Sequence, residues 1–374
     1  MQNHQARREL PEFTTDTEFG ERDSQAGGDT SMNGLYYKKL FSKKEGGNLP
    51  QLVIAENENM QSRFVVEKIL SLREEGIPLE EMAVLFRSSF LSFDLEIELA
   101  KANLPFVKYG GFKFIETAHV KDMIAYLRVL ENPRDLVSWN RILMLIDGVG
   151  PRTAETVTND IINKRLGTIA DGRETVVSEK FWRDYFSYPE GVQKLFETLK
   201  TAASPRMSPA EKSFHILNYY EPILKSQYDD HPKRMKDLET FQNIAERYKD
   251  VETFLTDMAL EPPNESVVDV ESPGKEDELL VLSTIHSAKG LEWKVVFIIS
   301  ALEGRFPSMK AQSDGDEMEE ELRLMYVACT RAKDHLFITY PINIFDRESG
   351  AILSKPSRFI EGIGEHLLEP WVVE

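Results

Sequence analysis

The sequence of 374 residues contains a single cysteine, Cys329. One cysteine cannot form an internal disulfide framework, so we expect a chain that folds in a reducing compartment. The sequence also lacks an apolar run long enough to cross a membrane, and its first residues lack the apolar core of a signal peptide. These absences predict a cytoplasmic protein without a membrane partner.

Positive charge is scarce in this chain. Its 45 lysines and arginines are outnumbered by 63 aspartates and glutamates, which gives a formal net charge of −18. This balance argues against a protein that holds nucleic acid by its bulk charge. A locally basic groove remains compatible with it, because phosphate contacts need only a few well-placed cations.

Two motifs of nucleotide-hydrolysing proteins are missing as well. The phosphate-binding pattern GxxxxGK[ST] does not occur, since the pair Gly274-Lys275 lacks both the upstream glycine and the following serine or threonine. No strand-like run ends in an Asp-Glu pair of the kind that holds magnesium in such sites. We therefore assign no residue as a metal ligand and expect no appreciable ATPase activity from this polypeptide alone.

The first part of the chain changes character twice. Residues 1–33 are polar and show no apolar periodicity, which predicts a disordered or loosely packed tail. Residues 34–110 then alternate strand-like and helix-like runs, the order that is typical of a parallel sheet. The expected strands are 51–55, 83–86 and 105–109, and the expected helices are 58–75 and 91–102.

Residues 111–278 read as an inserted all-α domain. The apolar spacing predicts helices at 119–130, 136–146, 152–163, 179–186, 192–201, 209–220, 234–249 and 251–260. An acidic linker with three prolines, 262–277, follows them. Residues 279–374 return to strands at 279–285, 295–299 and 335–340, so the predicted fold is α/β, with a parallel sheet built from two segments of the chain.

Residues His286–Glu292 form the most informative connection, because they join two buried strand-like runs. Ligands of open parallel sheets bind at the carboxyl ends of the strands, and this connection leaves such an end. It contains His286, Lys289 and Glu292, so we expect a binding site there.

Arg331 ends a predicted helix whose apolar stripe, facing the sheet, is Leu322, Met325, Tyr326 and Cys329. We expect Arg331 at the same sheet edge as the His286–Glu292 connection. Its planar guanidinium suits a phosphate there. Equally, a cation in this position stabilises the carboxyl end of a helix.

Several tracts together resemble a known family. Thr284–Trp293 (TIHSAKGLEW) and Tyr326–Ala332 (YVACTRA) are similar to motifs V and VI of superfamily 1A DNA helicases, the UvrD/Rep/PcrA group. Further similar tracts, in the family's order, are 83–89, 109–128, 301–308 and 355–360. The resemblance covers residue 35 to the end and implies the C-terminal half of such an enzyme, with a RecA-like domain 2A (34–110 and 279–374) and an inserted domain 2B (111–278).

The resemblance also implies roles for individual residues. Arg331 corresponds to the catalytic arginine that reaches the γ-phosphate of ATP, and Gly290, Glu292 and Lys289 to nucleotide contacts. Magnesium and most of the ATP contacts would come from the missing N-terminal half. For Lys289 a plain surface cation, and for Glu292 a solvated carboxylate, are the alternative interpretations.

For DNA, the resemblance implies two sets of contacts and a hinge. The single-strand set is Thr284, His286, Ser287, Arg87 and Ser88, and the duplex set is the Gly148 and Gly150 turn with Arg152 and Thr153. Paired glycines, Gly110 and Gly111, can absorb large dihedral changes where the helical insertion begins. Arg87 and Ser88 are equally suited to capping the following helix.

These observations favour the C-terminal portion of an ATP-dependent 3′-to-5′ DNA helicase or translocase that works with an N-terminal half, domain 1A, on single-stranded and duplex DNA. We expect a nucleoid-associated role such as DNA repair. A non-catalytic DNA-binding or protein-interaction module derived from a helicase is the alternative. The translocase part of a helicase–nuclease fits less well, because few residues follow Tyr340.

Overall fold

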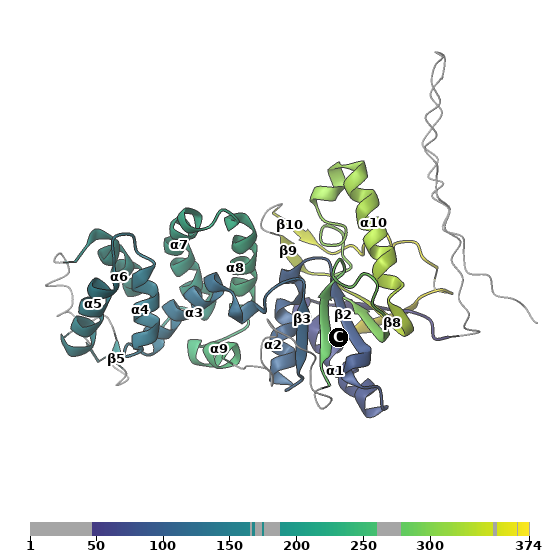
Figure 1. Ribbon diagram of the computed structural model, residues 1–374, viewed down its shortest axis with the longest axis horizontal. Coiled ribbons are helices and arrows are strands. Elements are labelled where there is room, and N and C mark those ends of the chain that lie inside the picture. Colours follow the sequence, from purple (N-terminus) through teal and green to yellow (C-terminus); the bar gives the residue numbers. More distant parts are fainter. Residues whose placement is uncertain are drawn as a thin grey trace, which may run out of the picture. The chain divides into compact units, whose positions relative to one another are not determined.

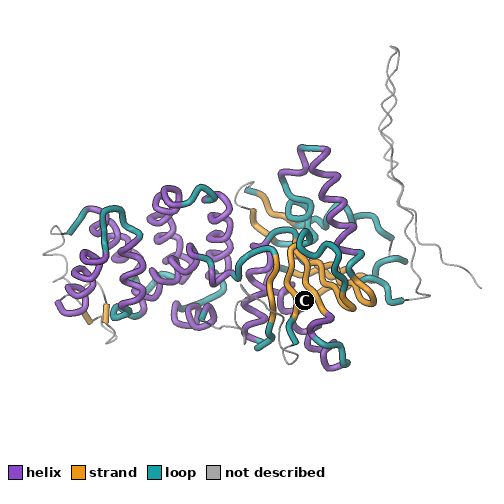
Figure 2. The backbone as a smooth tube through the Cα atoms, in the orientation of Figure 1, coloured by secondary structure: helices purple, strands orange, loops and turns teal. Residues whose placement is uncertain are grey.

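Seven strands form one sheet in which every neighbouring pair is parallel (Figures 1 and 2). The computed structural model of the chain describes residues 47–164, 167–168, 174–175, 188–259, 278–346, 350–364 and 366–373. The strand order is β11-β1-β8-β7-β2-β6-β3. The strands are β1 (Gln51–Ala55), β2 (Met82–Phe86), β3 (Phe106–Tyr109), β6 (Leu280–Thr284), β7 (Trp293–Ile298), β8 (Ala332–Pro341) and β11 (Glu369–Val373).

The sheet combines two distant segments of the chain, as expected. Strand β2 precedes the helical segment and pairs with β6 and β7, which both follow it. Strand β11 was not predicted: it lies in the C-terminal tail and adds an edge strand by pairing with β1, from Gln51 opposite Glu369 to Ala55 opposite Val373. A small hairpin of β9 (Ile344–Asp346) and β10 (Ala351–Leu353) was also missed.

Helices cover both faces of the sheet (Figure 1). On one face, α1 (Glu58–Glu74) and α2 (Phe93–Lys101) pack against Val84 and Phe86 of β2. On the other face, α10 (Gly315–Cys329) packs against Ala83 and Leu85 of the same strand. Successive side chains of a strand point to opposite faces, so β2 contributes to both cores and is buried along its whole length.

The buried face of α10 differs from the predicted one. Its buried residues are Glu321, Leu324, Met325 and Ala328, whereas Leu322 and Tyr326 are 36% and 37% exposed. The observed set has the same spacing as the predicted set but is shifted by one position along the chain. This shift corresponds to a rotation of about 100° around the helix axis. Apolarity alone favoured the wrong face, because a glutamate occupies one of the buried positions.

The segment between β3 and β6 is helical, as expected, apart from two short strands, β4 (Gly167–Thr168) and β5 (Glu174–Thr175). Its helices are α3 (Ala118–Glu131), α4 (Leu136–Met144), α5 (Pro151–Lys164), α6 (Glu190–Ala202), α7 (Pro209–Gln227), α8 (His231–Ala245) and α9 (Val251–Met258). The predicted helix 179–186, the tail 1–33 and the linker 262–277 lie outside the described residues. The division into domains at residues 111 and 278 stays a prediction.

The helices of this segment share one core, which is held together by buried polar contacts. Asp122 of α3 accepts hydrogen bonds from Arg141 Nε (2.6 Å) and from the Tyr220 hydroxyl (2.5 Å). His119 lies between Arg234, 3.1 Å from Nδ1, and Asp237, 2.9 Å from Nε2. A guanidinium can only donate, so Nδ1 of His119 accepts and Nε2 carries the proton that binds Asp237. These contacts connect α3 to α4, α7 and α8.

Helix α2 joins the helical segment to the sheet, and the described residues from Leu49 onward belong to one compact unit. The rings of Phe93 and Phe114 stack with their centroids 4.3 Å apart. Lys101 lies 3.0 Å from Asp257 of α9, and Asp94 pairs with Arg247. The helical core therefore continues onto α2 through both apolar and ionic contacts.

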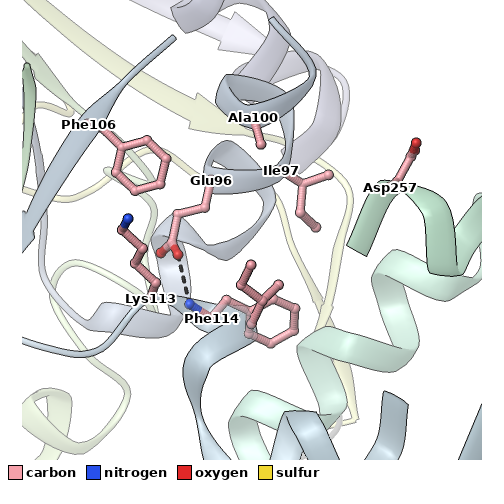
Figure 3. Close-up of a pocket in the computed structure, with 8 residues that line it drawn as sticks. Glu96, Ile97, Ala100, Phe106, Lys113, Phe114 and Asp257 are labelled. Carbon is pink, nitrogen blue, oxygen red and sulfur yellow. Dashed lines mark hydrogen bonds between the residues drawn. The ribbon is translucent and has the colours of Figure 1, made fainter. Parts of the chain in front are cut away.

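A small cavity lies at this junction (Figure 3). Its lining includes Glu96, Ile97, Phe106, Phe114 and Asp257. Its volume of about 20 Å³ leaves room for about one water molecule. It is therefore too small to be the nucleotide site.

None of the described helices is long and apolar enough to cross a membrane.

Candidate functional site

The candidate residues that belong to the sheet domain lie at two opposite edges of the sheet. Thr284 ends β6 and Phe86 ends β2, so the residues that follow them lie at the carboxyl edge. Trp293 and Ala332 begin β7 and β8 and pair with each other at the amino edge. Because β7 is parallel to β6, the chain has to return to the amino edge before β7 can start. The connection 285–292 makes that return.

The expectation that Arg331 and the whole connection share the carboxyl edge was therefore wrong. Thr284, His286 and Ser287 lie at the start of the connection, at the carboxyl edge. Gly290, Leu291 and Glu292 directly precede β7, and Arg331 directly precedes β8, so this second group lies at the amino edge.

Within the second group, Arg331 contacts the end of the connection, as expected. Its Nη1 donates to the Leu291 carbonyl oxygen over 2.7 Å, and its own carbonyl accepts from the Trp293 amide over 2.9 Å. Its Nε donates to the Val327 carbonyl over 3.0 Å and its Nη2 to the Thr330 hydroxyl over 3.1 Å. The guanidinium thus caps the end of α10 and also links it to the connection.

The amino-edge turn is open to solvent around Gly290. Gly290 has a φ of +89°, a conformation that side-chain-bearing residues rarely adopt, and no atom lies within 4 Å of where a Cβ would be. Lys289 is exposed. Glu292 forms an ion pair with Lys333 over 3.1 Å, with side chains 65% and 39% exposed. An exposed pair of this kind contributes little stability, so the Glu292 carboxylate remains available for another partner.

Hydroxyl groups gather at the carboxyl edge. Thr284 donates from Oγ1 to Ser287 Oγ over 3.0 Å, and the Ser287 amide donates to Thr284 Oγ1 over 3.4 Å. Gly110, at the end of β3, lies directly against them: a Cβ added to it would be 2.2 Å from Thr284 Oγ1. With a φ of +83° as well, this position accepts only glycine, and it brings the start of the helical insertion onto the hydroxyl cluster.

Arg87 follows β2 at this edge, but its side chain points to α10. Both Nε and Nη2 lie 2.8 Å from Oε1 of Glu321, a residue that is 2% exposed. The ion pair gives Arg87 a structural function that the sequence did not indicate. Ser88 precedes the short helix η2 (Ser89–Ser92) and makes no capping hydrogen bond with its side chain, so the capping alternative is not observed for it.

The Gly148–Gly150 turn leads into α5. Both glycines and Arg152 are exposed, and Thr153 is half-buried. The Gly150 carbonyl accepts the Ala154 amide over 2.9 Å, so α5 starts at Pro151. Proline has no N–H, which leaves the amides of Arg152 and Thr153 as the first donors of the helix. Two such amides beside an arginine suit an anionic group.

In the part of the chain that the structure describes, the thiol of Cys329 and the carboxylate of Asp314 have structural surroundings rather than those of a metal site. Burial raises the pKa of the Cys329 thiol to about 12, so it is protonated at neutral pH. Among the described residues, no group of three His, Cys, Asp or Glu side chains could hold a metal ion. Asp314 caps α10 by accepting the amides of Asp316 and Glu317.

Comparison with known sequences identifies the family. Residues 2–342 match the UvrD-like helicase C-terminal domain. The chain belongs to this family. A relative called ATP-dependent DNA helicase PcrA, from Staphylococcus epidermidis (strain RP62A), is 30% identical over 348 residues, which are 89% of this chain. The protein of the same name from Staphylococcus aureus (strain MRSA252) is 29% identical over 348 residues. The chain spans only 46% of the length of each of these relatives.

Membership of the UvrD-like C-terminal family agrees with the observed α/β fold, in which a parallel sheet with helices on both faces forms a RecA-like domain. The family match starts at residue 2, earlier than the expected start of the resemblance near residue 35. Sequence reasoning missed the contribution of Glu321, which holds Arg87 at the carboxyl edge, since nothing local marks a buried carboxylate.

Proposed function

We propose that this chain is the C-terminal portion of an ATP-dependent 3′-to-5′ DNA helicase or translocase. In this proposal the amino edge contacts ATP that an N-terminal half, domain 1A, binds, and the carboxyl edge contacts single-stranded DNA. Family membership supports the general role. The polarity and the individual residue roles rest on the resemblance of the motifs.

The observation that carries the proposal is the contact between Arg331 and the Leu291 turn. It brings a guanidinium, the exposed Lys289 cation and the open backbone at Gly290 to one edge, and this donor set fits the phosphates of a nucleotide. ATP with magnesium would supply the phosphoryl chemistry. The phosphate loop and the magnesium ligands would belong to the N-terminal half.

Apolar side chains beside this edge support a partner domain there. Leu291 is 47% exposed, and Leu322 and Tyr326 of α10 are 36% and 37% exposed. Leu322 and Tyr326 are four residues apart on α10 and therefore share a face of the helix. Covering them would explain why apolar residues occupy solvent-facing positions on the helix that ends just before Arg331.

For DNA, the proposal assigns Thr284, His286, Ser287 and Ser88 to the backbone of a single strand, with hydroxyl and amide donors that suit phosphate oxygens. Arg87 would act mainly by holding Glu321. Gly148, Gly150, Arg152 and Thr153 would contact duplex backbone through the first amides of α5. Gly110 and Gly111 would form the hinge of the helical segment.

A non-catalytic DNA-binding or protein-interaction module is the second candidate. One observation favours it: three donors of Arg331 already bind Val327, Thr330 and Leu291, as they would in a purely structural helix cap. The two candidates make different predictions for reconstitution with an N-terminal half.

The test mixes this chain with a separately purified N-terminal half of a PcrA-type helicase and measures ATP hydrolysis with and without single-stranded DNA. DNA-stimulated hydrolysis that needs both halves supports the helicase proposal. DNA binding by this chain without any restored hydrolysis supports the module instead. Unwinding of a duplex with a 3′ tail, but not of one with a 5′ tail, would establish the polarity.

A further inference from the structure

Two aromatic side chains are exposed where the chain leaves the sheet. Tyr109, the last residue of β3, is 48% exposed, and Phe112 is 69% exposed. Their neighbour Phe114 is fully buried at 0% exposure and stacks on Phe93. Phenylalanine is rarely left this open to water, because removing an aromatic ring from water is favourable. An exposed aromatic pair on one short segment suggests a ligand.

The same segment lies against the hydroxyl cluster at the carboxyl edge. Between the two aromatic residues, Gly110 touches Thr284 and Ser287, since an added Cβ would be 2.2 Å from Thr284 Oγ1 and 2.9 Å from Ser287 Oγ. At Gly111 an added Cβ would be 2.5 Å from the Ser89 hydroxyl. The aromatic residues therefore flank a backbone that is in direct contact with hydrogen-bond donors.

One carboxylate fixes both ends of this segment. Oε1 of Glu96 lies 2.6 Å from the Lys108 ammonium. Oε2 of Glu96 accepts the Phe114 amide over 2.8 Å (Figure 3). Ser92 donates to the same carboxylate over 2.8 Å. The pair is buried, with side-chain exposures of 1% for Lys108 and 6% for Glu96.

Further contacts hold the two lysines that flank the segment. The Lys108 ammonium also lies 4.8 Å from the Phe93 ring centroid, and that of Lys113 lies 5.2 Å from the Phe106 ring centroid. The chain from Tyr109 to Phe112 is thus held at both ends while its aromatic rings face solvent. Because the segment is already ordered, binding a ligand there costs less conformational entropy.

We propose that Tyr109 and Phe112 form a stacking platform for unpaired nucleobases. This inference rests on the proposed function, since the strand's phosphates would bind Thr284 and Ser287 beside the platform. Aromatic rings next to hydroxyl and amide donors are the combination that single-strand binding uses, with stacking for bases and hydrogen bonds for the backbone. A purely apolar protein partner would not need the donors. We therefore favour the nucleic acid.

The test compares two fluorescently labelled oligonucleotides of equal length and charge: oligothymidylate, and an abasic strand that has the same phosphates and no bases. Binding of the full chain is measured by anisotropy at low salt. The wild-type chain should bind oligothymidylate more tightly than the abasic strand. Phe112→Ala and Tyr109→Ala should each weaken oligothymidylate binding about five- to 100-fold. Binding of the abasic strand should be unchanged.

Three further variants sharpen the comparison. Phe112→Trp keeps a stacking ring and should retain the preference for bases. Phe214→Ala removes an exposed aromatic residue (51%) on α7, away from the segment, and should bind both strands as the wild type does. Thr284→Val should weaken the binding of both oligonucleotides equally, because it removes a hydroxyl that the proposed function assigns to a phosphate contact.

The outcomes separate this inference from the proposed function. If the wild-type chain binds neither strand at up to 100 times the concentration at which a PcrA-type helicase binds, the DNA role itself fails. If it binds both strands equally, or if Phe112→Ala weakens both alike, the platform is refuted and the phosphate site survives. If sedimentation instead shows self-association that Phe112→Ala abolishes, the aromatic residues are a contact between chains and the inference is wrong.

Discussion

Arg331 donates a hydrogen bond of 2.7 Å from its Nη1 to the carbonyl oxygen of Leu291. The contact joins the end of α10 to the turn before β7, and it brings together the two motifs that the sequence singled out. Leu291 lies two residues before the start of β7 and Arg331 directly before β8, so this group lies at the amino edge of the sheet. The hydroxyl cluster of Thr284 and Ser287 lies at the other edge, so the structure separates two sites that the sequence had merged.

The first prediction concerns the guanidinium. In the reconstituted enzyme, Arg331→Lys should lower the rate of DNA-stimulated ATP hydrolysis by about 10³-fold or more, because an ammonium keeps the charge but loses the planar fork that suits a phosphate. Steady-state ATPase assays at saturating ATP measure this. Arg323→Lys is the matched control: Arg323 lies on α10, is 61% exposed and pairs with the neighbouring Glu319 and Glu320. A similar loss in both variants would refute the role of Arg331.

The second prediction concerns the buried ion pair. Arg87→Ala should lower the free energy of unfolding by about 3–5 kcal/mol, because it leaves the Glu321 carboxylate buried without its cation. Urea denaturation measures the change. Arg87→Met combined with Glu321→Leu should recover most of the loss, since no unpaired charge remains. Arg73, which is 49% exposed and 4.0 Å from Glu278, provides the control, and Arg73→Ala should cost about 0.5 kcal/mol or less.

If Arg87→Ala has normal stability but binds single-stranded DNA weakly, Arg87 acts on DNA and the structural interpretation of its contact with Glu321 is wrong.

The third prediction uses the only cysteine. With its pKa raised from 9.0 to about 12, the Cys329 thiol should react with iodoacetamide at pH 8 about 10³-fold more slowly in the folded chain than in urea. The folded rate should rise about tenfold per pH unit up to pH 11, whereas the unfolded rate should level off above pH 9. Mass spectrometry of quenched samples measures both rates. Equal rates in the two states would show that the thiol is not buried.

The same shift has a consequence for stability. The folded thiol keeps its proton in the pH range where the unfolded thiol has lost it, so the folded state binds more protons there. The free energy of unfolding should therefore decrease as the pH rises above 9, and Cys329→Ser should reduce that decrease. Denaturation at pH 8 and pH 10 of both proteins gives the difference. If the free energy of unfolding changes with pH by the same amount in the wild-type chain and in Cys329→Ser, the expectation is wrong.

The fourth prediction concerns Gly110. Gly110→Ala places a Cβ 2.2 Å from Thr284 Oγ1 at a φ of +83°, so it adds a steric clash to backbone strain. Gly148→Ala has a similar φ of +75° but open space around the Cβ, and it is therefore the matched control. We expect about 1 kcal/mol of destabilisation at Gly148 and about 1–3 kcal/mol more at Gly110. Equal effects would mean that the segment moves away from Thr284 freely.

Much of the fold follows from local patterns in the sequence. The strand Gln51–Ala55 has the predicted bounds, and α3 and α6 differ from the predicted helices by a residue or two at each end. Apolar spacing, turn residues and capping residues act within a few positions along the chain, so the sequence displays them directly. The motifs around Gly290 and Arg331 were visible for the same reason. The family comparison agrees with what they indicated.

Only the tertiary structure decided which partners these elements have. The side of α10 that faces the sheet includes Glu321, whose buried carboxylate pairs with Arg87, a residue that follows β2 and is distant in sequence. Likewise, Glu96 becomes the anchor of the Tyr109–Phe112 segment only when Lys108 and Phe114 reach it from either side. A buried charge is stable only with a partner from elsewhere in the chain, and the parallel direction of β7 and β8 decides which edge holds Arg331. The spacing of residues along the chain indicates neither the partner of a buried charge nor the direction of a strand in the sheet.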